Sequence, residues 1–239
     1  MSGEFVGAVS VVTGAAGGIG RAVVEALSAR GAVVAALDHT EPAVGALRLC
    51  CDVTDERQVS ETVERAHKEL GPPAHLVCAA GVVSEAPVAE LDVDEWRRVV
   101  DASLLGTFLS ARAVLPAMLG AGRGRIVALS SGYARKGHAT GSHYAAAKAG
   151  VESFVKSLAL EVAEAGVAVN AVAPGPVATA MLEPFMARPG WQPTIEAAIP
   201  LGRVATPEDI VGPILFLLSE DSSYMTGQVL HVNGGLLMP

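Results

Sequence analysis

Tyr144 and Lys148 are the two side chains of this sequence best suited to moving a proton together. They stand four residues apart in SHYAAAKAG, so a helix would place them on one face. A free phenol has a pKa of about 10, too high for a base at neutral pH. A neighbouring ammonium favours the phenolate. The pair therefore indicates a tyrosine that takes a proton from an alcohol or returns one to a ketone.

A glycine-rich stretch, VVTGAAGGIGRA at residues 11–22, could hold a phosphate group. Its spacing is T-G-x-x-x-G-x-G, with Gly14, Gly18 and Gly20 at the matched positions. It lies between a strand-like apolar run and a helical pattern, where free backbone N–H groups and a helix N-terminus would face a pyrophosphate. By itself, such a stretch is equally consistent with a structural turn.

Asp38 makes the nucleotide interpretation stronger. It ends the apolar run AVVAALD, 18 residues after Gly20, where an acid binds the ribose hydroxyls of a dinucleotide. A carboxylate there repels a 2′-phosphate, and no Lys or Arg lies within 14–20 or 38–41 to attract one. The sequence therefore predicts NAD in preference to NADP. The alternative is that Asp38 is only a turn residue.

These residues need a scaffold, and the hydrophobic pattern predicts an α/β one. Short continuous apolar runs, typical of strands covered on both faces, occur at 8–13, 32–37, 47–51, 75–80, 125–130, 167–173 and 228–232. Amphipathic helical patterns separate them, and Thr206-Pro207 followed by two acids indicates another helix start. We expect one doubly wound domain over 1–239, a parallel sheet with helices on both faces.

The segment 181–205 is the one long stretch without a clear pattern, and we expect it to be irregular and to close over the substrate. Its large apolar residues are Met181, Leu182, Phe185, Met186, Trp191 and Ile195. They suit a ring or an acyl chain. The alternative is that they pack against the protein's own helices or another subunit.

Composition excludes several classes of partner. The formal charge of −8 argues against binding nucleic acid or an anionic membrane, and no apolar run is unbroken over a membrane-spanning length. The N-terminus lacks a signal-peptide pattern. Three cysteines cannot complete a disulfide framework, so we expect a cytoplasmic protein. The histidines show no metal-ligand spacing, although His138 or His143 could touch a substrate.

Taken in order along the chain, these motifs resemble those of the short-chain dehydrogenase/reductase family. They include the glycine turn, Asp38, "CDVTD", "AAG", "SS", Y-x-x-x-K, "NAVAPGPVATAM", "PLGRVATPEDI" and "TGQVLHVNGG". The resemblance extends over essentially the whole length. It implies a seven-stranded Rossmann fold, hydride transfer on a nicotinamide cofactor, a small-molecule substrate, and a homotetramer. The tetramer would form through the helix at 94–119, the tyrosine helix and the C-terminal strand region.

The resemblance also implies individual roles. The residues expected to cradle the pyrophosphate are Gly14, Gly18, Ile19 and Gly20. Those expected around the adenosine half are Asp38, Asp52 and Val53. Those expected to line the cofactor cleft through backbone atoms are Ala79, Ala80 and Gly81. Those expected to hold the nicotinamide are Pro174, Gly175, Val177 and Thr179.

The catalytic roles follow in the same way. Tyr144 would be the general acid/base, and Lys148 would bind the nicotinamide ribose and lower the tyrosine's pKa. Ser131, 13 residues before Tyr144, would hydrogen-bond the substrate oxygen, with Ser130 as its rival. Ser103 stands where the family has the asparagine that helps to hold a water beside the lysine. A hydroxyl replaces an amide there, so we expect weakened but surviving catalysis.

The function expected from this resemblance is NAD-dependent transfer of hydride between a secondary alcohol and its ketone. The substrate would be a cyclic diol or a 3-oxoacyl compound, and the cellular use of NAD favours alcohol oxidation. Two alternatives stay open. One is a nucleotide-binding regulator with little turnover, which Ser103 would favour. The other is an enzyme that uses bound NAD transiently, without net NADH.

Overall fold

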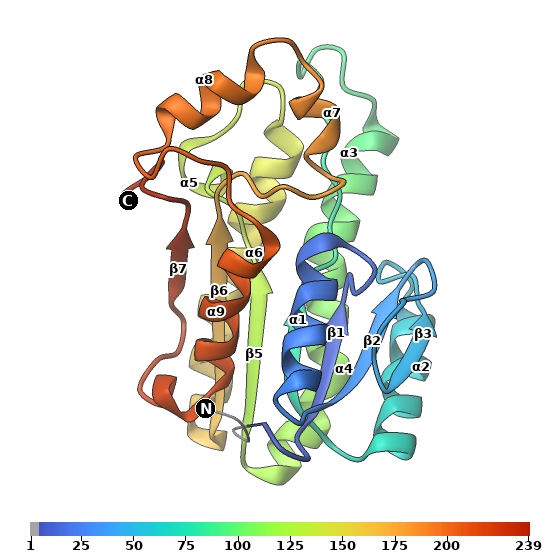
Figure 1. The fold of residues 1–239 in the computed structure, drawn as a ribbon. Coiled ribbons are helices and arrows are strands. Elements are labelled where there is room, and N and C mark those ends of the chain that lie inside the picture. Colours follow the sequence, from blue (N-terminus) through green and yellow to red (C-terminus); the bar gives the residue numbers. More distant parts are fainter. Residues whose placement is uncertain (1–4) are drawn as a thin grey trace.

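The computed structural model describes residues 5–239, and its centre is a seven-stranded parallel sheet (Figure 1). The strand order is β3-β2-β1-β4-β5-β6-β7. The bounds are β1 Val9–Thr13, β2 Val33–Asp38, β3 Leu47–Cys50, β4 Pro73–Cys78, β5 Gly124–Leu129, β6 Val167–Pro174 and β7 Val229–Val232. The predicted fold class is confirmed, and each predicted apolar run contains or overlaps one strand.

Helices cover both faces of the sheet. The longer ones are α1 Gly18–Ala29, α2 Glu56–Leu70, α3 Val93–Val100, α4 Gly106–Ala121, α6 Ser142–Val162 and α9 Pro207–Leu218. In Figure 1, α1 and α9 lie in front of the sheet and pack together, whereas α2, α4 and α6 lie behind it. Thr206 and Asp209 form the capping box that starts α9, as its sequence predicts.

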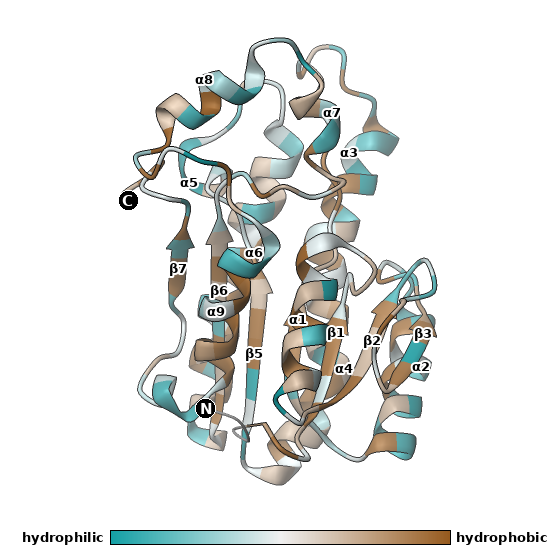
Figure 2. Cartoon of the chain, in the orientation of Figure 1, coloured by the Kyte–Doolittle hydropathy of each residue, from teal (hydrophilic) through white to brown (hydrophobic). Residues whose placement is uncertain are grey.

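Each face of the sheet carries its own apolar core, and Figure 2 shows the strands as mostly hydrophobic. Val23 and Leu27 of α1 are fully buried against one face, and Val151 and Val155 of α6 against the other. Burial on both faces is what makes the strands continuous apolar runs. The sheet is therefore a rigid base for whatever its carboxyl ends carry.

Helices α3 and α4 form one continuous helical stretch, Val93–Ala121, with a π-helical turn at Asp101–Leu105 between them. By length and composition alone, this stretch could cross a membrane, which the sequence analysis had excluded. Core helices of soluble folds meet the same criteria, and here the stretch packs against α2, α6 and β4. The π turn holds Ser103, which is completely buried.

The segment expected to be irregular contains two short helices, α7 Glu183–Met186 and α8 Trp191–Ala198. The expectation was wrong because Pro184 stands in the first turn of α7, where proline is tolerated, and Gly190 adopts the left-handed conformation that starts α8. Both helices lie above the carboxyl ends of the strands in Figure 1.

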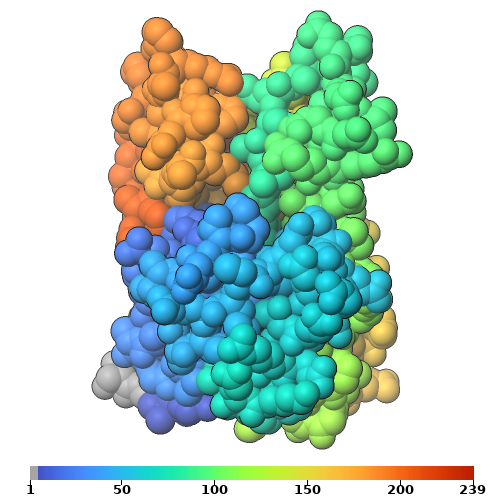
Figure 3. Space-filling view, turned by 90° about the vertical axis from the view of Figure 1, so that its right-hand side faces the viewer, coloured from blue at the N-terminus to red at the C-terminus, as the bar shows by residue number. Residues whose placement is uncertain are grey.

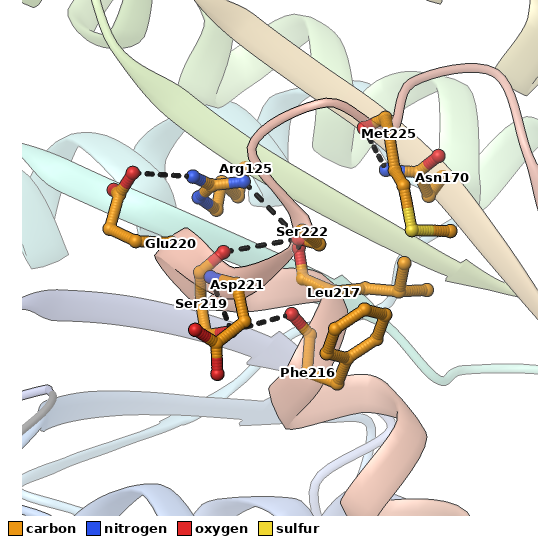
Figure 4. A network of polar contacts seen from close by, with 9 residues as sticks. All are labelled: Arg125, Asn170, Phe216, Leu217, Ser219, Glu220, Asp221, Ser222 and Met225. Carbon is orange, nitrogen blue, oxygen red and sulfur yellow. Dashed lines mark hydrogen bonds and ion pairs between the residues drawn. The ribbon is translucent and has the colours of Figure 1, made fainter.

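A polar network at the opposite end of the sheet anchors the connection from α9 to β7 (Figure 4). Arg125 of β5 pairs with Glu220 at 2.9 Å and donates to the Ser222 hydroxyl at 3.3 Å. Asn170 of β6 donates to the carbonyl of Met225 and accepts the N–H of Gln228. This network holds the chain just before β7 against β6. The position of β7 in turn sets where the C-terminal segment after Val232 begins.

Candidate active site

A cavity opens at the carboxyl ends of β4, β5 and β6, beneath α7 and α8. About 1080 Å³ of empty space lies between its walls and the open solvent at its mouth. Figure 3 shows a hollow between the segment that carries α7 and α8 (orange) and the segment that carries α3 (green). The predicted site residues that line the cavity are Ile19, Ala79, Gly81, Ser131, Tyr144, Lys148, Pro174, Gly175, Val177 and Thr179.

The glycines of the first turn are required by the protein's own packing. Gly14 has a φ of +68°, and a Cβ there would lie 2.5 Å from the backbone nitrogen of Ala80. A Cβ on Gly20 would strike the carbonyl oxygen of Gly14, and one on Gly18 the side chain of Thr179. The turn is thus pressed against the end of β4 on one side and the loop after β6 on the other.

This turn also fits a pyrophosphate. Gly17 precedes α1 without a capping side chain, and the first turn of the helix carries no acid. The N–H groups that begin a helix have no partner within it, so they are free to bind an anion. Ile19, in the same turn, lines the cavity. The residues present therefore fit a dinucleotide laid from this turn into the cavity.

Asp38 ends β2 beside the glycine turn and is only 6% exposed. Its Oδ2 accepts the N–H of Ala16 at 3.0 Å, and its Oδ1 accepts that of Thr40 at 3.2 Å. The side chain of His39 lies 2.7 Å from Oδ1. The carboxylate therefore ties the glycine turn to the end of β2, a structural role beyond the ribose contact that the sequence predicts.

Ser131, Tyr144 and Lys148 meet at the inner end of the cavity. The Ser131 side chain is close enough to that of Tyr144 to lower the pKa of the phenol. Lys148, 4% exposed, donates from Nζ to the carbonyl of Leu129 at 2.7 Å and lies 5.7 Å from the centre of the Tyr144 ring. The predicted i, i+4 pair therefore shares one face of α6, as expected, and that face looks into the cavity.

The expected effect of the lysine on the tyrosine is not seen in the chain alone. Tyr144 keeps an open side toward the cavity, but burial by the surrounding protein raises its pKa to about 12, and the Ser131 hydroxyl lowers it only in part. Burial lowers the pKa of Lys148 to about 8. Removal from water disfavours both charged forms, so without further charge in the cavity Tyr144 is a phenol and therefore a proton donor.

Burial of Lys148 predicts a pH-dependent stability difference. Because its pKa falls from 10.5 to about 8 on folding, the folded state binds fewer protons between those values. The penalty, roughly 3 kcal/mol, is fully present below pH 8 and is relieved as the pH rises toward 10.5. We expect the unfolding free energy of the wild type, relative to that of Lys148→Met, to increase by about this amount between pH 7 and pH 10.5.

Urea unfolding at a series of pH values measures this difference. Lys156→Met, which removes an exposed lysine from the same helix, should follow the wild type at every pH. A constant difference between wild type and Lys148→Met across this range would contradict the burial of a charged lysine.

Ser130 and Ser131 point to different partners, which favours Ser131 for the substrate role. Ser130 is 3% exposed and donates to the carboxylate of Glu152 at 2.9 Å and weakly to the carbonyl of Lys148. Glu152 in turn pairs with Arg135. The Ser131 hydroxyl accepts the N–H of Tyr133 and can still donate into the cavity.

Ser103 does not line the cavity and lies directly behind Gly81. Its hydroxyl is fully buried, with no hydrogen-bond partner among residues 5–239. A Cβ on Gly81 would stand 3.3 Å from Ser103 Oγ and 3.4 Å from Lys148 Nζ. Both polar groups therefore lie close to one point, an arrangement that suits a bridging water.

The remaining predicted nucleotide residues lie outside the cavity. Asp52 is exposed and accepts bonds from the N–H and hydroxyl of Thr54. Val53 is 8% exposed and packs against Gly106 of α4. Ala80 holds its backbone against Gly14. The structure brings these three residues to the same edge of the sheet as the glycine turn but not to the catalytic end.

Sequence reasoning missed part of the cavity wall. The additional lining residues include Val83, Leu129, Tyr133, Lys136, Asn233, Leu236 and Leu237. Asn233 donates to the carbonyl of Leu237 and accepts the N–H of Gly235, and these bonds hold the C-terminal tail beside the cavity. Of the six apolar residues expected to cover the substrate, Met181, Leu182, Phe185 and Trp191 line the cavity.

Neither candidate histidine lines the cavity. His143 is fully buried and its Nε2 bonds to the hydroxyl of Ser84 at 2.8 Å. His138 pairs with Glu85 at 3.2 Å, and Arg188, on the segment that carries α7 and α8, pairs with the same carboxylate at 2.7 Å. Within residues 5–239 no group of three His, Cys, Asp or Glu could hold a metal ion.

A Rossmann sheet with a nucleotide turn and a buried Ser-Tyr-Lys group defines a nicotinamide-dependent oxidoreductase, and known proteins agree. Residues 14–237 match the family model described as enoyl-(acyl carrier protein) reductase. The chain is 36% identical to the 3-oxoacyl-(acyl-carrier-protein) reductase FabG of Escherichia coli (strain K12), over 98% of this chain and 99% of that protein. It is 40% identical to cis-4-hydroxycyclohexanecarboxylate dehydrogenase of Sinomonas cyclohexanicum, over 98% of each.

The solved structures give the same result. The aldohexose dehydrogenase of Thermoplasma acidophilum superposes with a TM-score of 0.93 at 29% identity, over 99% of this chain and 96% of that one. The chain belongs to the short-chain dehydrogenase/reductase family. It is an enzyme that acts on CH–OH groups with a nicotinamide cofactor, which argues against a regulator without turnover.

Proposed function

We propose that this enzyme transfers hydride between NAD and a secondary alcohol or its ketone, with Tyr144 as general acid/base. The observation that carries the proposal is that Ser131, Tyr144 and Lys148 line one cavity, with Lys148 Nζ 5.7 Å from the centre of the Tyr144 ring. Two hydroxyls converging on one point can bind one carbonyl or alcohol oxygen.

Each residue has a distinct task in this proposal. NAD, when bound, supplies or accepts the hydride at its nicotinamide ring. Ser131 donates a hydrogen bond that fixes the substrate oxygen, and Tyr144 transfers the proton to or from that oxygen. Lys148 binds the nicotinamide ribose and adds positive charge near the phenol. Pro174, Gly175, Val177 and Thr179 hold the nicotinamide against the cavity wall.

Asp38 supports NAD in preference to NADP. Its carboxylate lies beside the glycine turn, and among residues 5–239 no Lys or Arg forms an ion pair with it. A ribose hydroxyl can donate to a carboxylate, whereas a 2′-phosphate meets like charge there. We expect kcat/KM for NAD to exceed that for NADP, measured by NADH or NADPH absorbance with a panel of secondary alcohols, dihydrodiols, sugars and acyl ketones. A preference for NADP would refute this part of the proposal.

The water expected beside Lys148 allows a test of whether the Ser103 hydroxyl takes part in catalysis. If its hydroxyl and Lys148 bridge through a water, Ser103→Ala interrupts a proton route to solvent, and we expect kcat to fall by about tenfold. The unfolding free energy should not fall, because the hydroxyl has no protein partner to lose. Steady-state kinetics and urea unfolding of the same variant separate the two effects. Wild-type kcat in Ser103→Ala would remove Ser103 from the mechanism.

The cavity supports a substrate with a ring or an acyl chain. Its outer wall is formed by Met181, Leu182, Phe185 and Trp191, beside Leu236 and Leu237 of the C-terminal tail. The names of two relatives include a 3-oxoacyl group and a hydroxycyclohexane ring. Both are compatible with an apolar wall around one reacting oxygen. In the protein alone burial keeps Tyr144 protonated at neutral pH, the state that can donate a proton to a ketone.

We also propose that the enzyme is a cytoplasmic homo-oligomer. Exposed apolar residues lie on the outer faces of α4 and α6, including Phe108, Leu119 and Leu160. Phe108 packs edge-to-face on Phe154, which joins the two helices into one surface. Among the described residues the three cysteines are free, which suits a reducing compartment.

A further inference from the structure

The cavity has an unusual balance of charge. The chain carries 25 acidic and 17 basic residues, yet the described residues that line the cavity include two lysines and no aspartate or glutamate. One of the two, Lys148, is at the inner end and donates to the carbonyl of Leu129. The other, Lys136, stands at the outer end. It has no part in the proposed chemistry.

Lys136 is the free member of two adjacent cations. Arg135 pairs with the buried carboxylate of Glu152 at 2.8 Å. Lys136 forms no ion pair within residues 5–239, and its Nζ lies over the ring of Tyr133, 5.3 Å from the centre. Tyr133 also lines the cavity. Glu85, whose charge helps to raise the pKa of Tyr133, is paired with Arg188 and His138.

The backbone ties Lys136 to the segment that carries Ser131. It is the last residue of α5, Tyr133–Lys136, which begins two residues after Ser131. The Ser131 hydroxyl accepts the N–H of Tyr133, and the N–H of Gly132 donates to the carbonyl of Pro174. Lys136 is therefore on the same short segment as Ser131, and its flexible side chain reaches the cavity that Ser131 also lines.

We propose that Lys136 binds a carboxylate on the substrate, at the end remote from the reacting C–O group. The substrate class is then an oxo acid or hydroxy acid whose carbon frame lies against the apolar wall. One unpaired ammonium beside the apolar residues Phe185 and Trp191 suits a carboxylate, whereas a phosphate calls for more donors. This inference rests on the proposed function, because it takes Ser131 and Tyr144 as the position of the reacting oxygen.

The test compares oxo acids with their methyl esters. The probes are 4-oxocyclohexanecarboxylate and linear oxo acids of increasing length, each with its ester, reduced with NADH by the wild type, Lys136→Met and Lys136→Arg. For the wild type we expect kcat/KM for the best acid to exceed that for its ester by about tenfold or more. In Lys136→Met we expect the acid-to-ester ratio of kcat/KM to fall by about the same factor, because KM for the acid rises. In Lys136→Arg we expect most of the wild-type ratio to remain, because the positive charge is kept.

Lys156→Met, on the exposed side of α6, should keep the wild-type ratio. Equal turnover of acid and ester by the wild type, or an unchanged ratio in Lys136→Met, overturns the role of Lys136 and leaves the proposed function standing. Reduction of other ketones in the panel, without reduction of any oxo acid, likewise overturns the role of Lys136 and leaves the proposed function standing. If no ketone or alcohol of any kind is turned over with NAD or NADH, the proposed function fails as well.

Discussion

Tyr144→Phe should lose about 10³-fold or more in kcat/KM, because it removes the proton donor and leaves the ring. Phenylalanine has the same shape, so the packing of the ring near Tyr133 and above Lys148 is kept. We expect the variant to fold with wild-type stability and to bind NAD with a Kd close to that of the wild type. Trp191 lines the cavity, so its fluorescence can report the binding.

The pH dependence of the same variant sharpens this prediction. With its pKa raised to about 12 by burial, Tyr144 is a phenol at neutral pH and suits ketone reduction. Alcohol oxidation needs the phenolate, so its kcat/KM should rise with pH in the wild type. This rise should be absent from Tyr144→Phe. A matched control is Tyr133→Phe in the same cavity, which should lose less than about tenfold. Comparable loss in both variants would contradict the assignment of the acid.

Ser131→Ala and Ser130→Ala should separate activity from stability. Ser131→Ala removes a hydrogen bond to the substrate oxygen, and we expect a loss of about 10²-fold in kcat/KM. Its hydroxyl accepts one N–H within the protein, so the unfolding free energy should change little. Ser130→Ala removes a donor to the buried Glu152 and should cost about 1–3 kcal/mol of stability with little loss of activity.

Kinetics and urea unfolding on both variants make the comparison. The opposite result, with activity lost in Ser130→Ala and kept in Ser131→Ala, would exchange the roles of the two serines. It would also require the Glu152 network to rearrange when substrate binds, because Ser130 now faces that carboxylate.

The strands and the main helices could be predicted because burial on both faces leaves a continuous apolar pattern. The seven runs found in the sequence correspond to the seven strands, and the two acids after Thr206 mark a helix start that the structure has. The glycine turn was also placed correctly. What the pattern did not reveal is that Gly14 and Gly20 are needed for contacts inside the turn itself.

The parts of the site that escaped prediction depend on contacts between distant segments. Glu85 and Arg188 form an ion pair although they lie far apart in the sequence, and nothing local to either residue signals the pair. Lys136 lies in a four-residue helix, too short to leave a periodic pattern. The raised pKa of Tyr144 could not be predicted because it results mainly from burial, which the sequence does not state.

The central claim is that hydride passes between the nicotinamide and a substrate carbon whose oxygen is held by Tyr144 and Ser131. The most direct measurement is reduction of a ketone with NADH deuterated at the transferring position, followed by mass spectrometry of the product. For the wild type we expect one deuterium on the carbinol carbon of the product, and for Tyr144→Phe we expect negligible product. Product without deuterium, or equal labelled product from Tyr144→Phe, would contradict it.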